Sequence, residues 1–117
     1  MFNFIPKPPP LEPKSHAYEL KRRLDWGEPA LTIVDARDRV AFNTSHISGA
    51  ISLPLEEMPS NALQCLELDR DIYIYANTDE ETAVAATQLR EANFRNVSEL
   101  RGGVAGWKAF GYPVVSN

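Results

Sequence analysis

Four short runs of apolar residues, rich in β-branched and aromatic side chains, recur along the chain between turn-forming residues. Runs of this length and composition are typical of buried β-strands. They span residues 30–35, 49–55, 71–76 and 96–100. The third run, "DIYIYA", is the most apolar over its last five residues, so we expect it to be a central strand.

Segments of helical character lie between and around these runs. The first places Ala17, Leu20 and Leu24 on one stripe, which is the spacing of an amphipathic helix, and Ser15 stands where a cap is expected. The longest carries three acidic residues at its start, which favours a helix N-terminus. The expected helical segments span residues 15–26, 36–47 (a short helix and a loop), 55–68, 79–94 and 101–114.

Alternating strands and helices predict a single α/β domain with a central, mainly parallel sheet and helices on both faces. In such sheets, sites form outside the carboxyl ends of the strands. Three loops are therefore candidates, namely those that follow Asp35, Ala76 and Leu100.

The first 14 residues differ from the rest, because "FIPKPPPLEPK" holds five of the nine prolines. We expect residues 1–14 to form a proline-rich arm and residues 15–117 to form the domain. Proline favours extended chain, so one interpretation is an arm on the domain surface. The P-x-x-P spacing leaves a second interpretation open, in which the arm is a ligand for an aromatic groove.

Composition and charge exclude several classes of protein. The chain of 117 residues is 44% hydrophobic and 24% charged, as in an ordinary globular domain, and its net charge of −4 argues against binding to nucleic-acid phosphates. No apolar run reaches the roughly 20 residues that span a bilayer, and the start has no secretory signal, so we expect a cytoplasmic protein without a membrane partner. A single cysteine and two separated histidines predict neither a disulfide nor a metal site.

The loop after the third run, "ANTDEET", raises a chemical question. A strand followed by a tight loop and a helix N-terminus usually favours an external anion. Here the loop carries Asp79, Glu80 and Glu81. One interpretation is a capping box, with Thr78 as N-cap and Glu81 reaching back to it. The other is that the carboxylates form a partner site.

Several segments in this order resemble the rhodanese-like domain family. "IVDARDRVAFNTSHISGAISLPL" looks like its first half, with a strand that ends in Asp-x-Arg and a His-Ile-x-Gly-Ala segment. The second half is similar in its apolar strand, loop and long helix, its Gly-Gly turn with a tryptophan, and its closing "GYP". The resemblance covers roughly residues 16–115. It implies a three-layer fold of four to five strands, in which the proline-rich leader would supply a fifth strand at the edge.

The same resemblance implies that catalytic groups are missing. Active members transfer sulfane sulfur through a cysteine directly after the central strand, and that position falls on Ala76. The family's loop arginine falls on Glu81 and its small hydroxyl residue on Thr82. Ser45 is a further departure, because the family usually has glycine there. We therefore expect a non-catalytic binding or regulatory module, without a cofactor, whose partner is another protein and whose binding loop comprises Ala76, Asn77, Thr78, Asp79, Glu80, Glu81 and Thr82.

The alternative is a sulfurtransferase that uses Cys65 or an unrecognised group. We expect Cys65 to lie on the inner face of its helix, where a thiol is structural and inert. His46 could be a base, but no nucleophile is identifiable for it to serve. The resemblance implies structural roles for Asp35, Arg37, His46, Gly102, Gly103 and Trp107.

Overall fold

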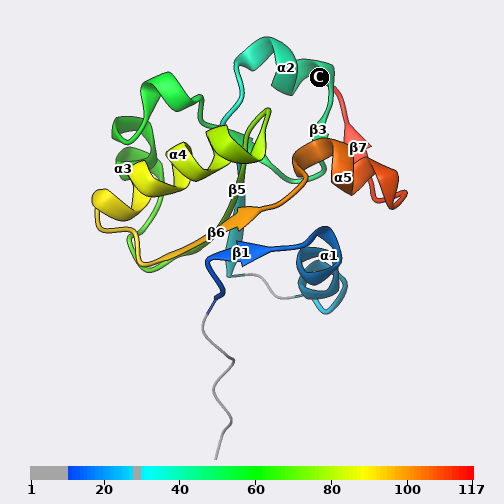
Figure 1. The fold of residues 1–117 in the computed structure, drawn as a ribbon, viewed down its shortest axis with the longest axis horizontal. Coiled ribbons are helices and arrows are strands. Elements are labelled where there is room, and N and C mark those ends of the chain that lie inside the picture. Colours follow the sequence, from blue (N-terminus) through cyan, green and yellow to red (C-terminus); the bar gives the residue numbers. More distant parts are fainter. Residues whose placement is uncertain (1–10, 28–29) are drawn as a thin grey trace, which may run out of the picture.

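The computed structural model describes residues 11–27 and 30–117. A parallel sheet of five strands runs through its centre, in the order β1-β6-β5-β2-β4 (Figure 1). The strands are β1 (Lys14–Ser15), β2 (Leu31–Asp35), β4 (Ile51–Ser52), β5 (Asp71–Tyr75) and β6 (Asn96–Leu100). The predicted parallel sheet is confirmed, and β5 is its middle strand as expected.

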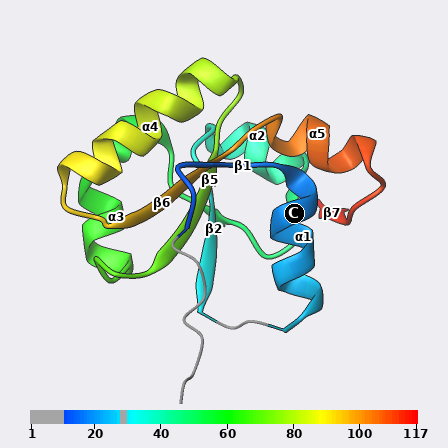
Figure 2. The same cartoon turned by 60° about the horizontal axis from the view of Figure 1, so that its bottom comes forward.

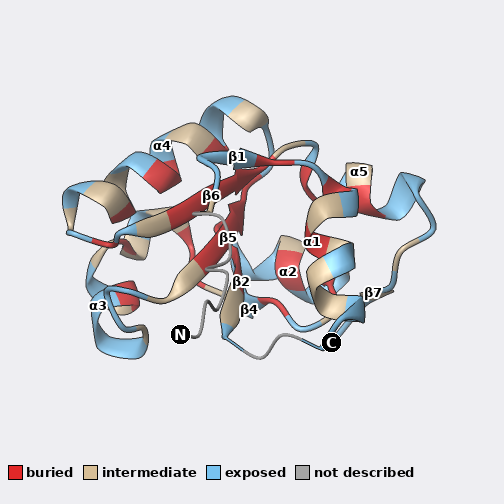
Figure 3. Cartoon of the chain, turned by 90° about the horizontal axis from the view of Figure 1, so that it is seen from below, coloured by how far each residue is buried: buried red, intermediate tan, exposed pale blue. Residues whose placement is uncertain are grey.

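Helices cover both faces of this sheet, so the domain has three layers. They are α1 (Ala17–Asp25), α2 (Arg39–Thr44), the 3₁₀ turn η1 (Leu55–Glu57), α3 (Ser60–Cys65), α4 (Asp79–Glu91) and α5 (Gly103–Ala109). Figures 2 and 3 show α3 and α4 on one side of the buried strands and α1, α2 and α5 on the other. The predicted three-layer α/β architecture is confirmed.

Each face of the sheet has its own hydrophobic core. Beneath α3 and α4, Ile72 and Ile74 of β5 pack with Leu89. On the opposite face, Tyr73 and Tyr75 pack with Trp107. Because successive side chains of a strand point to opposite faces, the continuous apolar run of β5 fills both cores at once.

The leader joins the sheet at its edge. In β1, Lys14 pairs with Glu99 and Ser15 pairs with Leu100. This is the edge strand that the family resemblance suggested. The proline-rich arm predicted for residues 1–14 lies outside the described residues up to residue 10, and its P-x-x-P interpretation stays untested.

The N-cap expected at Ser15 is wrong. The N-cap of α1 is His16, whose backbone N–H donates to the Glu19 side chain at 2.8 Å. Ser15 is buried in β1, where its hydroxyl forms a hydrogen bond with the hydroxyl of Ser98. Pairing with β6 therefore takes the residue that the local pattern had assigned to the helix.

Two further features differ from the expected elements. The helix expected over residues 55–68 is broken at Met58 and Pro59 into η1 and α3. A second, antiparallel sheet of two short strands pairs β3 (His46–Ile47) with β7 (Val114–Val115). No sequence pattern predicted it.

Candidate functional site

The loop from Ala76 to Thr82 lies at the carboxyl edge of the sheet, between the central strand β5 and α4. The loops that follow β2 and β6 emerge at the same edge, because both strands run parallel to β5. The three candidate loops of the sequence analysis are thus neighbours. Ala76 is the first residue of its loop and is only 6% exposed.

The Thr82 side chain links the two ends of the loop by hydrogen bonds. Its Oγ1 accepts a hydrogen bond from the Ala76 N–H at 2.8 Å and donates one to the Thr78 carbonyl oxygen at 2.9 Å. The side chain is 1% exposed, so both bonds are shielded from water. The buried hydroxyl therefore fixes the distance between the end of β5 and the first turn of α4.

Thr78 caps α4 as predicted. Its Oγ1 accepts a hydrogen bond from the Glu81 N–H at 3.1 Å. Among the hydrogen bonds of the described residues, the reverse bond of a capping box, from the Thr78 N–H to the Glu81 side chain, does not occur. The predicted cap is confirmed in its first half only.

Asp79 connects two loops, a role that the sequence analysis missed. Its Oδ1 accepts a hydrogen bond from the Gly102 N–H at 3.0 Å, and its Oδ2 lies 3.4 Å from Nη2 of Arg101. Arg101 also pairs with Glu99 at 3.4 Å. The Gly102 N–H and the Arg101 guanidinium could bind an external anion. Here the Asp79 carboxylate binds both of them instead.

The remaining polar residues of the loop face water. Asn77, Glu80 and Glu81 are exposed. Within the part of the chain that the structure describes, neither Glu80 nor Glu81 forms an ion pair. The outer side of the loop is consequently a small negative surface.

A buried ion pair lies beside the loop, at the end of β2. Arg37 donates to both Asp35 oxygens, from Nη2 at 2.7 Å and from Nε at 3.0 Å and 3.2 Å. It also donates to the carbonyl oxygen of Ser45. Burial on its own lowers the pKa of Arg37, but the hydrogen bond and the charge of Asp35 outweigh burial and raise it. The Arg37 guanidinium therefore stays charged and ties the end of β2 to the segment before β3.

Tyr75 extends this network across the sheet. Its hydroxyl donates to Asp35 Oδ2 at 2.7 Å and accepts from the Ile47 N–H at 3.2 Å. Burial raises the pKa of Tyr75, and the hydrogen bond to Asp35 raises it further. The tyrosine is therefore neutral at physiological pH. Its hydroxyl links Asp35 to the backbone of Ile47 and plays a structural part.

His46 is buried, and both its ring and its Nδ1 contact Phe42. Nδ1 donates to the Phe42 carbonyl oxygen at 2.7 Å, and the imidazole stacks on the Phe42 ring with centroids 3.7 Å apart. It belongs to β3, whose partner strand is β7. These contacts join α2 to the small antiparallel sheet.

The glycine turn after β6 packs directly against the loop. A Cβ atom on Gly103 would lie 3.3 Å from the Ala76 carbonyl oxygen, and Gly102 and Gly103 both have positive φ, +84° and +55°. Glycine is the residue that allows this approach and this backbone. Trp107 of α5 donates from Nε1 to the Pro113 carbonyl oxygen at 2.8 Å and holds the C-terminal segment.

Cys65 is not where the sequence analysis expected it. It is exposed at the end of α3, and the prediction of an inward-facing thiol is wrong. Figures 1 and 2 show α3 toward the C-terminal end of α4, away from the N-terminus that adjoins the loop. The thiol is thus separate from the cluster of loops.

Within residues 11–27 and 30–117, the His, Cys, Asp and Glu side chains form no group of three or more that could hold a metal ion. None of the helices in this part of the chain has the length and apolar character that a bilayer crossing requires.

Comparison with curated proteins finds relatives that match most of the domain. The chain is 30% identical over 97 residues to a protein named sulfurtransferase from Allochromatium vinosum, across 83% of this chain and 89% of that protein. It is 33% identical over 90 residues to a probable adenylyltransferase/sulfurtransferase MoeZ from Mycobacterium tuberculosis, across 76% of this chain and 23% of that protein. An uncharacterized protein from Synechocystis, slr1261, is 32% identical across 75% of this chain and 49% of its own length. The chain thus spans about half or less of the length of several curated relatives.

Solved structures share the fold of this chain, and two of them have a higher sequence identity to it than the curated relatives do. A crystal structure of the Alr3790 protein from Anabaena sp. is 51% identical with a TM-score of 0.85, and covers 87% of this chain and 91% of that one. A solution structure of the rhodanese-like domain of the same protein is 50% identical with a TM-score of 0.87, and covers 92% and 81%. A family model for the rhodanese-like domain matches residues 16–110. The chain therefore belongs to the rhodanese-like domain family.

Proposed function

We propose that this rhodanese-like domain does not transfer sulfur and works as a protein-binding or regulatory module. The observation that carries the proposal is the identity of residue 76. It is the first residue after the central strand, where the family resemblance places the nucleophilic cysteine, and it is alanine. A methyl group cannot accept or donate sulfur.

The charges around residue 76 support the same proposal. Sulfur transfer requires a thiolate that helix N–H groups and positive charge stabilise. Here Asp79 already occupies the Gly102 N–H, and the exposed carboxylates of Glu80 and Glu81 add negative charge to the rim. Like charges repel, so these groups oppose both a thiolate and an anionic sulfur donor.

The alternative, a sulfurtransferase that uses Cys65, has two observations in its favour. The thiol is exposed, and one relative is named a sulfurtransferase. Against it, α3 has only six residues and no basic residue in its last turn, so the helix itself supplies no positive charge to stabilise a thiolate.

The direct test is the reaction of thiosulfate with cyanide, which gives sulfite and thiocyanate. We expect thiocyanate formation no faster than in a reaction without protein. Activity that disappears in the Cys65→Ser variant would establish the alternative. Activity that persists in this variant would require a group other than a thiol and would also contradict the proposal.

Restoring the missing groups provides a positive control. Ala76→Cys alone should give little activity, because Glu81 still opposes the thiolate. Ala76→Cys combined with Glu81→Arg should give more, because the cation stabilises both the thiolate and its persulfide. Equal activity of the two variants would show that the charge at position 81 does not matter.

A further inference from the structure

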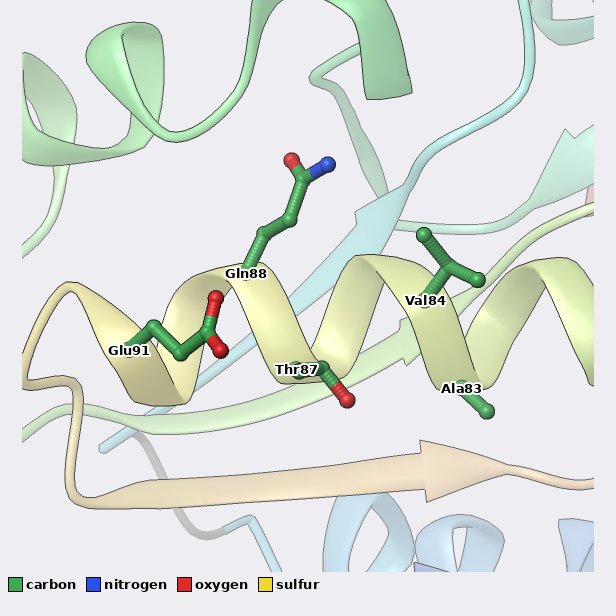
Figure 4. Close-up of a pocket in the computed structure, with 5 residues that line it drawn as sticks. All are labelled: Ala83, Val84, Thr87, Gln88 and Glu91. Carbon is green, nitrogen blue, oxygen red and sulfur yellow. The ribbon is translucent and has the colours of Figure 1, made fainter.

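The outer face of α4 carries a groove that no other segment of the described chain covers. Its walls are two rows of side chains with the helical spacing of four residues. One row is Ala83, Thr87 and Glu91, and the other continues from Glu80 through Val84 and Gln88. Figure 4 shows Val84 and Gln88 projecting to one side of the helix and Ala83 and Thr87 to the other. The hollow between them has a volume of about 340 Å³.

The groove lies opposite the face by which α4 packs on the sheet. The buried residues of the helix are Thr82, Ala85, Ala86 and Leu89. Val84 is 51% exposed. Helices pack by inserting a row of side chains from one into the groove between rows of the other. Small side chains in the middle of this groove leave room for such a row.

Carboxylates stand at both ends of the groove. Glu80 and Glu81 lie at the start of α4 and Glu91 at its last turn, and within the described residues none of the three forms an ion pair. Glu80 and Glu91 are eleven helical rises apart, which corresponds to about 16 Å along the axis. Gln88 lines the groove, and its Oε1 is buried without a hydrogen-bond donor among the described residues.

We propose that this groove binds a basic amphipathic helix of a partner protein. Aliphatic side chains of the partner, three residues apart, enter the groove beside Val84. This type of packing aligns two helices to within about 20°. Lysines or arginines near both ends of the partner segment then reach Glu80 and Glu91.

Charge complementarity selects this occupant. Acidic segments and nucleic acids are repelled by the same carboxylates. The inference rests on the proposed function, since it names the class of partner for a binding module. It extends the predicted binding loop along the helix, because Glu80 belongs to both the loop and the groove.

The test uses a synthetic helical peptide of roughly 18 residues, long enough to form a helix. It carries leucine and alanine at positions three apart and lysines at both ends. A matched peptide has glutamate in place of lysine. Binding to the ¹⁵N-labelled chain is followed by amide chemical shifts at low salt. We expect the basic peptide to shift amides of residues 80–91 and the acidic peptide to shift none.

Three variants localise the binding. Glu80→Lys with Glu91→Lys should weaken it at least tenfold, because two attractions become repulsions. Thr87→Trp should weaken it similarly by filling the groove without changing the charge. The control, Glu56→Lys with Glu67→Lys, reverses two exposed carboxylates outside α4 and should change the affinity by less than about twofold.

The possible outcomes separate the two proposals. Absence of binding, or equal losses in the α4 variants and the control, would overturn the groove as a site. Shifts confined to residues 76–79, with residues 83–91 unaffected, would also overturn it while leaving a binding module. Thiocyanate formation would instead contradict the proposed function, whatever the peptide does.

Discussion

Replacing Thr82 by valine tests how the loop is held. Valine has nearly the shape of threonine, so the substitution leaves no cavity and removes only the hydroxyl. The Ala76 N–H then loses its acceptor in a buried site, which costs about 1–3 kcal/mol. The Thr78 carbonyl oxygen loses one donor but keeps the Thr82 N–H at 2.9 Å, so this second loss adds only about 0.5 kcal/mol. We expect the free energy of unfolding to fall by about 1.5–3.5 kcal/mol.

The assay is urea unfolding followed by the fluorescence of the two tryptophans and by circular dichroism. Trp107 is buried and Trp26 is 82% exposed, so the signal change reports mainly on the core around α5. Thr82→Ser keeps the hydroxyl and loses a methyl group, at a cost of about 1 kcal/mol. Thr87→Val, on the exposed face of the same helix, should stay within about 0.5 kcal/mol. If the valine variant at residue 82 is as stable as the serine variant, the hydroxyl does not hold the loop.

Three other predictions use the same unfolding and titration methods. Asp79→Ala should cost about 1–2 kcal/mol more than Glu80→Ala, because only Asp79 has partners in the turn after β6; equal costs would refute this link. The hydrogen bond from Arg39 lowers the pKa of Glu57 from its ordinary value. The folded state therefore gains stability from this carboxylate at higher pH, and this contribution is lost as the pH falls through the lowered pKa. Carboxyl NMR titration should show the pKa of Glu57 returning toward its ordinary value in Arg39→Met. Burial raises the pKa of Tyr75 above 10, so the folded state retains the proton longer than the unfolded state and stability should decline as the pH rises beyond 10; this decline should be smaller in Tyr75→Phe.

The long elements of the fold are the ones whose positions could be predicted most accurately from the sequence. β2, β5 and β6 lie within one residue of their expected bounds, and α4 begins at the expected residue and ends three residues early. An apolar run or a capped helix start carries its own signal in the sequence. The two-residue strands β3 and β7 carry none, since each is too short to show alternation. They pair only because the fold brings His46 and Val115 together.

The candidate loop illustrates a similar division. Thr78 could be predicted as a cap, since its partner Glu81 is three residues away. The partners of Asp79 are more than twenty residues away, so spacing along the helix indicated only a favourable charge at its N-terminus. Cys65 was misplaced because α3 has six residues, too few for periodicity to distinguish its inner face from its outer face.

By itself the sequence determined the alternation of strands and helices, the central position of β5, and the alanine at residue 76. These depend on residue type and local order, which the chain carries in every conformation. Tertiary structure alone decided that Asp79 joins Gly102, that Ser15 enters the sheet instead of capping α1, and that the groove on α4 stays uncovered. Each of these depends on which distant segments become neighbours. Contacts between distant segments produce no periodic pattern in the sequence, so they cannot be predicted from it.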